Sequence, residues 1–406
     1  MTALPRLAAP ALTHAAGVMP VIVVTGARQT GKTTLVRDIA PTGERPYFTL
    51  DDLDVLEQAG RAPDDLVGRA ERLTLDEVQR APQLLLAVKR AVDRRRRAGR
   101  FLLTGSANLL LMHRISETLA GRASYLTLWP MTRREQLGMG RGGIWQELLD
   151  AKDEDWPDVV AAQRIGREDW QALARRGGYP VPALDLNSDD ARATWFAGYV
   201  QTYLERDLRD LSVVTSLPDV RRLMRAICLR LGQLLNQTEL GRDVTLPQPT
   251  VHRWLNLLET SYQLVRVPAY AVNRTKRVIK TAKVYWADTA LALHVAGLAE
   301  PGGPHLENLV LSDLLAWRDV RLDRPEVLYW RTATGEEVDF VIEAGRTLLP
   351  IEVKSTARPR PDDAKHLLVF REEYRRRCRP GLLVHTGDAI EWLAAGVLAA
   401  PWWKVL

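Results

Sequence analysis

Apolar runs that alternate with helical patterns organise the first part of the chain. Val21 to Thr25 is a continuous apolar run of the kind found in buried strands, and a glycine-containing turn and a helical pattern follow it. Similar strand-like runs return at 45–52, 72–79 and 100–108. Strands that alternate with helices form parallel sheets with their sites at the carboxyl ends of the strands. The pattern therefore predicts an α/β domain whose functional residues follow its strands.

The sheet pattern stops near residue 138 and gives way to helical patterns. Residues 138–176 are glycine-containing, then acidic and dotted with tryptophan, whereas 190–209 has a long helical pattern. We therefore expect a helical linker and insertion over 138–210. Further helical patterns lie near 221–232, 236–240 and 251–260.

Two strand-like runs rich in basic residues follow these helices. Three helices and a basic hairpin predict a winged helix over 211–295. A basic hairpin suits a phosphate backbone and salt-dependent binding, although solvated charge or a protein partner explains it equally well. The expected DNA contacts are Arg253, Arg274, Lys276, Arg277 and Lys280, and Lys283 is expected on the same wing.

A second group of charged residues lies in the last hundred residues. Asp339 sits in one strand-like run, and Glu352 and Lys354 share one face of the next. Carboxylates that hold Mg²⁺ and a lysine that positions water are what phosphodiester cleavage needs. Glu307, which opens an apolar helix, is a further candidate for this site. An ordinary salt bridge between strands is the alternative interpretation.

The turn after the first predicted strand has the pattern of a phosphate-binding loop. Gly26 and Gly31 bracket it and Lys32 and Thr33 follow, which matches G-x-x-x-x-G-K-[ST]. Glycines let successive N–H groups turn toward a phosphate, and the start of the next helix adds positive charge. Lys32 is expected to reach the β- and γ-phosphates, and the Thr33 hydroxyl to hold Mg²⁺. The predicted nucleotide-binding residues are Gly26, Ala27, Arg28, Gln29, Thr30, Gly31, Lys32, Thr33 and Thr34.

Polar residues end the next two predicted strands. Asp76 and Glu77 close an apolar run, where Asp76 would hold Mg²⁺ and Glu77 would activate water, unless they are only a solvated strand end. Ser106 would sense the γ-phosphate, although it also suits a plain turn. Arg122 would reach the nucleotide of a neighbouring subunit, although a surface arginine has the same pattern.

Composition narrows the class of protein only slightly. The 406 residues are too many for one core, and a net charge of +6 is mild for this length. Cys228 and Cys378 lie far apart without zinc-ligand spacing, so we expect neither a disulfide scaffold nor a zinc site and place the chain in a reducing cytoplasm. We expect no signal peptide and no membrane span, because prolines interrupt the apolar residues 8–27.

These motifs together resemble the prokaryotic single-chain AAA+ ATPases. The resemblance rests on 26–34, 75–77, 103–106 and 119–122, together with the turn at 177–180. Glu337-Val-Asp339 with Ile351-Glu-Val-Lys354 is similar to the restriction-endonuclease-like, PD-(D/E)xK, signature. The resemblance implies an AAA+ core, a winged helix, a nuclease-like fold and a ring in which Arg122 acts between subunits.

The expected fold is α/β with four parts. They are an AAA+ P-loop domain with a parallel sheet over 1–137, a helical linker and insertion over 138–210, a winged-helix domain over 211–295 and a C-terminal α/β restriction-endonuclease-like domain over 296–406.

The expected function is ATP hydrolysis with Mg²⁺ that drives remodelling of, or translocation on, duplex or branched DNA by a hexameric ring. Two alternatives stay open. One is an ATP-gated regulatory switch that binds a protein partner and uses an inactive nuclease-like domain for docking. The other is an ATP-dependent DNA nuclease.

Overall fold

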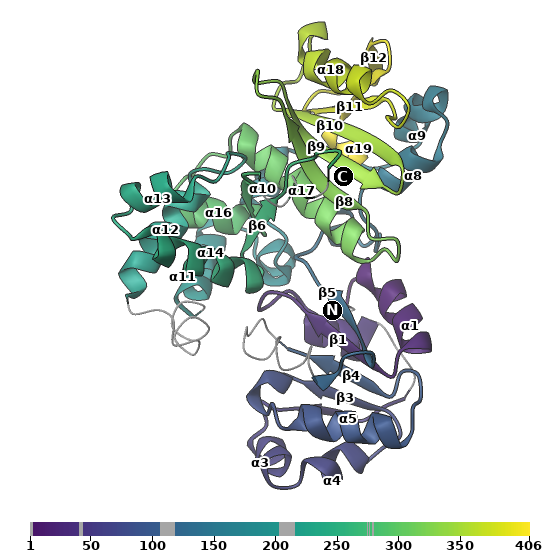
Figure 1. The fold of residues 1–406 in the computed structure, drawn as a ribbon, viewed down its shortest axis with the longest axis vertical. Helices are drawn as coiled ribbons and strands as arrows, with labels where there is room; N and C mark the ends of the chain where they lie inside the picture. The colour runs from purple at the N-terminus through teal and green to yellow at the C-terminus, as the bar shows by residue number, and fades with distance from the viewer. Residues whose placement is uncertain are drawn as a thin grey trace.

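The chain forms three parts, as the computed structural model shows (Figure 1). It describes residues 3–39, 44–105, 118–202, 216–273, 275, 277 and 280–406. The amino-terminal part holds a five-stranded sheet, the middle part is mainly helical, and the carboxyl-terminal part holds a six-stranded sheet.

The amino-terminal sheet is parallel throughout, which confirms the predicted α/β domain. Its strands lie in the order β2-β3-β4-β1-β5. In the central pairing, Val21 is opposite both Phe101 and Ala123. The strands are β1 (Val21–Thr25), β2 (Tyr47–Thr49), β3 (Leu73–Asp76), β4 (Phe101–Thr104) and β5 (Ala123–Thr127).

Helices cover both faces of this sheet, which explains why β1 is apolar at every position. Successive side chains of a strand point to opposite faces. Val21 and Val23 pack with the helices on one face, and Ile22 and Val24 pack on the other. The first face carries α3 (Leu53–Arg61), α4 (Pro63–Gly68) and α5 (Leu84–Arg94), and the second carries α1 (Ala8–Val18).

The middle part surrounds a core to which Tyr179, Trp254 and Trp286 contribute. An antiparallel pair, β6 (Leu264–Val267) and β7 (Lys283–Trp286), joins its helices. These are the elements that a winged helix requires, and that interpretation stays a prediction. The helices are α10 (Trp170–Arg176), α11 (Asp189–Thr202), α12 (Leu217–Cys228), α13 (Gln237–Asp243), α14 (Gln248–Thr260) and α16 (Thr289–Ala296).

The carboxyl-terminal sheet is mixed, with strand order β12-β13-β11-β10-β9-β8. Strand β10 runs parallel to β11 and antiparallel to β9. Its helix α17 (Gly303–Asp319) contributes to the core on one face and α18 (Lys365–Glu373) to the core on the other. The strands are β8 (Glu326–Arg331), β9 (Glu337–Ala344), β10 (Thr347–Lys354), β11 (Gly381–His385), β12 (Glu391–Ala394) and β13 (Val397–Pro401).

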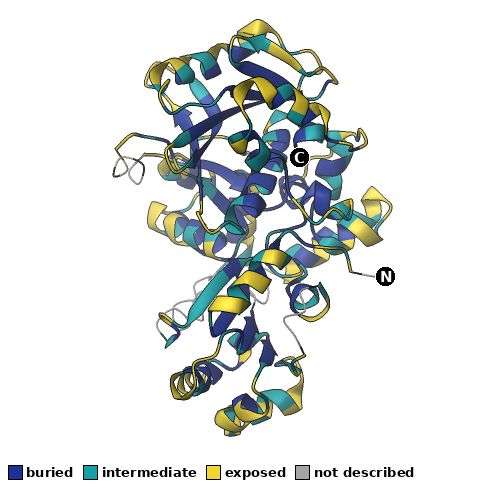
Figure 2. Cartoon of the chain, turned by 90° about the vertical axis from the view of Figure 1, so that its right-hand side faces the viewer, coloured by how far each residue is buried: buried dark blue, intermediate teal, exposed yellow. Residues whose placement is uncertain are grey.

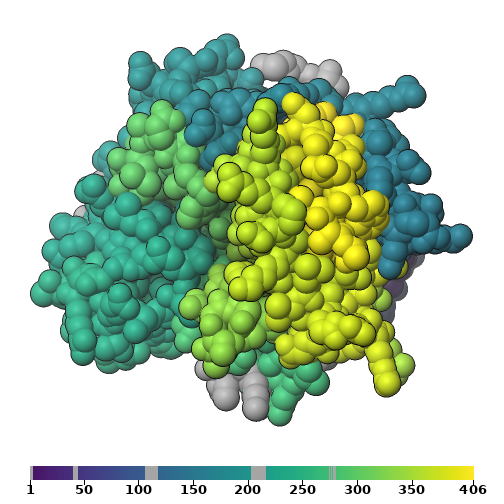
Figure 3. All heavy atoms as spheres, turned by 90° about the horizontal axis from the view of Figure 1, so that it is seen from above, coloured from purple at the N-terminus to yellow at the C-terminus, as the bar shows by residue number. Residues whose placement is uncertain are grey.

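The segment after residue 138 packs against this sheet. Trp145 of α8 (Trp145–Asp150) and Trp156 of α9 (Trp156–Ala161) are buried in its core, beside Trp402 of α19 (Trp402–Val405). Figure 3 shows this segment in blue against the yellow end of the chain. In Figure 2 most central strands of both sheets are dark blue, and the outer helices carry many of the exposed yellow positions. None of the helices in the described ranges has the length and apolar character needed to cross a membrane.

Candidate functional site

The phosphate-binding loop joins β1 to the short helix α2 (Lys32–Thr34). Gly26 and Gly31 have φ angles of 143° and 90°, a region that side chains with a Cβ rarely adopt. A Cβ at Gly26 would lie 2.3 Å from the carbonyl oxygen of Leu128. The loop therefore keeps its shape only with glycine at this position.

The ammonium of Lys32 is folded onto the loop itself. Its Nζ donates to the carbonyl oxygens of Ala27 at 2.7 Å and Gly26 at 3.2 Å, and the side chain is buried. A buried ammonium surrounded by backbone of the loop attracts an anion, since phosphate oxygens are stronger acceptors for it than carbonyl oxygens. This arrangement matches the role predicted for Lys32.

Hydroxyl groups converge on Asp76 at the carboxyl end of β3. The Thr33 hydroxyl donates to Asp76 Oδ2 at 2.9 Å, Tyr47 donates to the same oxygen, and Thr104 donates to Oδ1. A threonine hydroxyl beside a carboxylate is a donor set of hard oxygen ligands, which Mg²⁺ prefers. These residues therefore fit a magnesium ion next to the loop.

Glu77 follows Asp76 in a left-handed backbone conformation. Its φ angle of 56° is uncommon for a residue other than glycine, and such outliers cluster at functional sites. The backbone N–H of Glu77 donates to Thr104 Oγ1 at 3.4 Å, and Gln79 donates to the Glu77 carboxylate. The predicted base thus stands beside the predicted magnesium ligand, at the same edge of the sheet.

The two remaining catalytic candidates are Ser106 and Arg122. Ser106 lies outside the described residues. Arg122 precedes β5, and its carbonyl oxygen accepts from the first N–H of β1, so it lies at the end of the sheet opposite to Lys32. Its guanidinium pairs with Asp93 at 2.6 Å. Arg122 does not complete the site of its own chain, and its action between subunits stays a prediction.

Arg6 also holds the phosphate-binding loop, and no motif in the sequence pointed to it. Its buried guanidinium donates to the carbonyl oxygens of Thr30 and Trp129, both at 2.8 Å, and forms a 3.0 Å ion pair with Glu135. An arginine before an apolar helix is an ordinary pattern, so the residue type alone gave no signal. The contact ties the loop to α7 (Arg133–Gln136).

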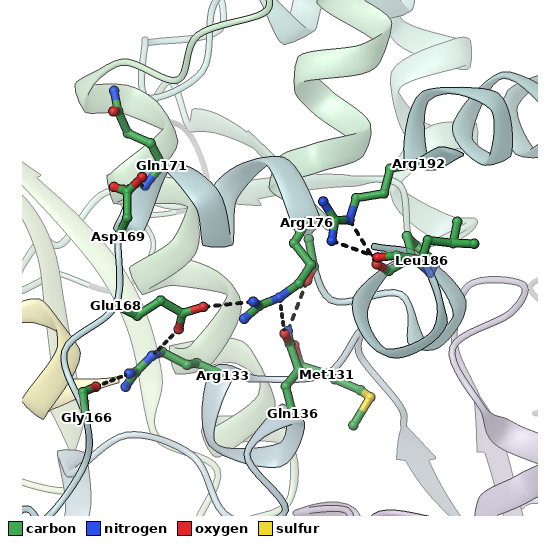
Figure 4. A network of polar contacts seen from close by, with 12 residues as sticks. Met131, Arg133, Gln136, Gly166, Glu168, Asp169, Gln171, Arg176, Leu186 and Arg192 are labelled. Atoms are coloured by element: carbon green, nitrogen blue, oxygen red, sulfur yellow. Dashed lines mark hydrogen bonds and ion pairs between the residues drawn. The ribbon is translucent and has the colours of Figure 1, made fainter. Parts of the chain in front are cut away.

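Helix α7 in turn connects the sheet to the rest of the molecule (Figure 4). Arg133 pairs with Glu168 at 2.8 Å and donates to the carbonyl oxygen of Gly166 at 2.7 Å. Arg176 donates to Gln136 at 2.9 Å and pairs with Glu168 at 2.8 Å. A continuous series of polar contacts thus runs from the phosphate-binding loop through Arg6 and α7 to residues 166–176.

A direct contact also reaches the loop from the middle part. The hydroxyl groups of Tyr262 and Thr25 lie 2.9 Å apart, and Thr25 is the last residue of β1. Tyr262 has a φ angle of 57° and packs edge-on against Trp129. The middle part thus touches the strand that carries Gly26.

The carboxylates predicted in the last hundred residues do come close together, with a lysine that was not predicted among them. Lys283, on β7, is buried, and its Nζ lies 2.5 Å from Glu337 and 3.3 Å from Asp339. The second oxygen of Asp339 accepts from the backbone N–H of Val353 at 3.0 Å. Lys283 was expected on an exposed wing, and this expectation was wrong.

Two further carboxylates complete this group, which we call the acidic cluster: Glu307, Glu337, Asp339 and Glu352. Glu352 pairs with Lys354 at 2.8 Å, and Glu307 accepts from the Tyr285 hydroxyl at 3.0 Å. Burial, together with the nearby Asp339 charge, raises the pKa of both Glu307 and Glu352 well above their ordinary value.

The acidic cluster does not fit a divalent metal ion. Two lysine ammonium groups already pair with three of its four carboxylates, and that of Lys283 lies close to both Glu337 and Asp339. Within the described ranges, no group of three histidine, cysteine or acidic side chains is placed to hold a metal. We therefore derive no metal-dependent chemistry from this cluster.

The residues predicted to contact DNA do not form one exposed basic surface among the described residues. Arg253 and Lys280 are exposed, whereas Arg274 and Lys276 lie outside the described residues. Arg277 is buried, and its guanidinium pairs with Glu343 at 2.5 Å and Glu326 at 2.7 Å. The prediction of an exposed Arg277 on a wing was wrong, because the connection between β6 and β7 lies along the edge of the carboxyl-terminal sheet, where Ala269 pairs with Tyr329.

Comparisons with known proteins identify the first domain. Residues 19–137 match the AAA domain family, whereas 167–302 and 302–405 match two domains of unknown function, DUF8612 and DUF4143. An AAA domain is a nucleotide-binding domain, in agreement with the geometry of the loop.

Two relatives that align with most of the chain are uncharacterized proteins. An uncharacterized protein of Mycobacterium tuberculosis is 31% identical over 366 residues, which cover 87% of this chain and 74% of the relative. An uncharacterized protein of Haemophilus influenzae is 21% identical and covers 68% of this chain and 64% of its own. Among solved structures, a Walker-type ATPase of Pyrococcus abyssi aligns with 71% of this chain and 94% of its own, with 17% identity and a TM-score of 0.42.

Proposed function

The chain belongs to the family of the uncharacterized mycobacterial protein and carries an AAA domain, and from this premise we propose that it binds and hydrolyses ATP with Mg²⁺. The observation that carries the proposal is the meeting of Lys32, Thr33 and Asp76 at the carboxyl edge of a parallel sheet. A glycine-rich turn and a helix start lie at the same edge, as phosphate binding requires.

Each residue of the site has a role that follows from its chemistry. Lys32 would exchange its carbonyl contacts for the β- and γ-phosphates, and Thr33 and Asp76 would hold the metal. Magnesium, when bound, neutralises charge on the phosphate oxygens. Glu77 accepts a proton from the attacking water, and Ser106 is proposed to sense the γ-phosphate. Arg6 is a positioning residue, because it acts through the carbonyl oxygen of Thr30.

Phosphate release from ATP by the purified full chain tests this proposal. We expect release that depends on Mg²⁺ and falls at least about 100-fold in Thr33→Ala, since the hydroxyl that pairs with Asp76 is lost. Thr33→Ser keeps a hydroxyl at the same place and is expected to retain most of the rate. Equal rates in Thr33→Ala and the parent chain would refute the assignment of the site.

We further propose that hydrolysis is coupled to DNA and that the chain works as a ring in which Arg122 acts between subunits. The support is indirect: exposed basic residues outside the AAA domain and contacts from Tyr262 and α7 that connect the loop to the other parts. Duplex or branched DNA is expected to stimulate ATP hydrolysis at low salt and to lose this effect as salt rises. Absence of stimulation at low salt would contradict the coupling to DNA.

One observation favours a second candidate, an ATP-gated switch that binds a protein partner. The lysines of the acidic cluster compensate its carboxylates, as expected of a domain used for docking rather than for cleavage. Such a switch would hydrolyse ATP at a rate that DNA does not change. The same stimulation experiment therefore separates the two candidates.

A further inference from the structure

A cavity lined mainly by arginine lies beside the turn between β9 and β10. Its volume is about 760 Å³, and we call it the arginine groove. The arginines that line it are Arg277, Arg346, Arg376, Arg377 and Arg379. They come from the connection between β6 and β7, from the β9–β10 turn and from the segment that follows α18. The groove thus gathers positive charge from three separate stretches of the sequence.

Acidic residues compensate only part of this charge. Glu343 is the acidic residue in the lining, and its two oxygens pair with Arg277 at 2.5 Å and with Arg377 at 2.8 Å. Arg379 pairs with Asp153 at 2.7 Å. Arg277 also pairs with Glu326 at 2.7 Å, so three carboxylates pair with three of the five arginines, which leaves a net positive charge in the groove.

Two of the arginines are available to a ligand. Arg346 and Arg376 are both exposed, and their side chains form no hydrogen bond or ion pair with any residue in the described ranges. The guanidinium group is a planar fork of donors that matches two phosphate oxygens at once. Two such groups beside a wide cavity are suited to a ligand with repeated phosphates.

The backbone around the groove is held in place by the sheet. Leu348 of β10 accepts from the N–H of Arg379 and donates to the carbonyl oxygen of Arg377, both at 2.8 Å. The Arg377 side chain also donates to the carbonyl oxygen of Arg346 at 2.8 Å. Because the backbone segments are fixed, only the side chains of Arg346 and Arg376 have to be ordered when a ligand binds.

We propose that the arginine groove binds the phosphodiester backbone of duplex DNA. The proposal rests on the DNA coupling proposed above, and it places the contact on the carboxyl-terminal sheet instead of on the β6–β7 hairpin. Proteins that grip single strands stack bases on aromatic side chains, and none of the described residues that line this groove is aromatic. Duplex backbone is therefore the better match, and binding is independent of sequence and dependent on salt.

Binding of a labelled duplex of mixed sequence to the full chain tests the groove. The test variant is Arg346→Glu with Arg376→Glu. The control is Arg61→Glu with Arg95→Glu, which changes the net charge equally at two exposed positions of the AAA domain. Fluorescence anisotropy gives the affinity at several salt concentrations, and the thermal unfolding midpoint reports folding of each variant.

We expect the groove variant to lose roughly ten-fold or more in affinity at low salt. The slope of log affinity against log salt should shrink by about two, one for each lost phosphate contact, whereas the control should keep the parental slope. Equal binding by the groove variant and the parent would refute the proposal that the arginine groove binds DNA and would leave the coupling of hydrolysis to DNA intact. No binding by the parent at low salt would overturn both, whereas the Thr33→Ala experiment judges ATP hydrolysis separately.

Discussion

The phosphate-binding loop and the acidic cluster both bring lysine close to carboxylate, yet they use it differently. In the loop, Lys32 donates to backbone carbonyl oxygens, and Asp76 accepts from neutral hydroxyl groups. In the acidic cluster, Lys283 and Lys354 pair directly with carboxylates. In the first site these partners of the ammonium and the carboxylate are neutral groups, whereas in the second two lysines pair with three of the four carboxylates.

The two sites differ in the partners of their charged groups, although both have the spacing of a known motif. The spacing of Asp339, Glu352 and Lys354 suits metal-dependent cleavage as well as the spacing of Lys32 and Asp76 suits nucleotide binding. The distinction comes from Lys283, which belongs to a strand more than fifty positions earlier in the chain. Its buried ammonium pairs with Asp339, so the carboxylate that the pattern assigns to a metal takes part in a contact between β7 and β9.

The largest expected effect in stability concerns Lys283. Lys283→Met leaves Glu337 and Asp339 without the buried cation between them, and removal of one partner of a buried pair costs about 3–5 kcal/mol. The free energy of unfolding from chemical denaturation measures this cost. Lys280→Met, at an exposed position nearby, is the control. A loss no larger than that of the control would show that Lys283 does not hold the cluster.

In the nucleotide site, substitution of Glu77 should lower the rate of ATP hydrolysis without changing the affinity for the nucleotide. Glu77→Gln keeps the size of the side chain and removes the proposed base, so the rate of ATP hydrolysis should fall roughly 100-fold or more. The affinity for a fluorescent ATP analogue should change little, because Glu77 does not hold the phosphates. Glu71→Gln, which alters an exposed glutamate of the same domain, serves as the control. If Glu77→Gln hydrolysed ATP at the parental rate, Glu77 would not be the general base.

Asp313 is a buried carboxylate that, unlike those of the acidic cluster, forms no ion pair with a lysine in the described ranges. Its Oδ1 accepts from the N–H of Gly143 at 2.7 Å and from Trp145 Nε1 at 2.6 Å, whereas Oδ2 has no partner within the described residues. Burial raises the pKa of Asp313 to about 6.

The sign of the resulting pH dependence follows from this shift. Between the unfolded pKa near 4 and the folded pKa near 6, the native state binds more protons, so the free energy of unfolding rises as pH falls from 7 toward 4.5. Asp313 contributes about 1–3 kcal/mol to this rise, and Asp313→Asn should remove that part of it. Denaturation at several pH values measures the slope. Identical slopes in the parent and Asp313→Asn would contradict the assignment.

Local patterns predicted the amino-terminal half of the site well. Val21 to Thr33 is contiguous in sequence, so strand, turn and helix start could be placed from apolar runs and glycines alone. Asp76 was reachable because a carboxylate at the end of an apolar strand faces the same edge of a parallel sheet. The hydroxyl groups of Tyr47 and Thr104 that hold it gave no comparable signal.

The contacts between distant segments could not be predicted. Lys283 lies in a run that is basic at its start and apolar at its end, and such a run does not reveal which side chains enter the core. Arg6 and Glu135 form a buried pair 129 positions apart, and neither residue has a motif around it. Charged side chains are usually exposed, so burial of these three residues depends on partners that only the folded chain brings together.

The most direct test of the account is the ATPase activity of Lys32→Ala beside Lys152→Ala, which removes an exposed lysine far from the loop in sequence. We predict that Lys32→Ala releases phosphate at background level, because the phosphate contact of the loop is lost, and that Lys152→Ala retains the parental rate. Phosphate release by Lys32→Ala at the parental rate would contradict the claim that this loop is the site of ATP hydrolysis.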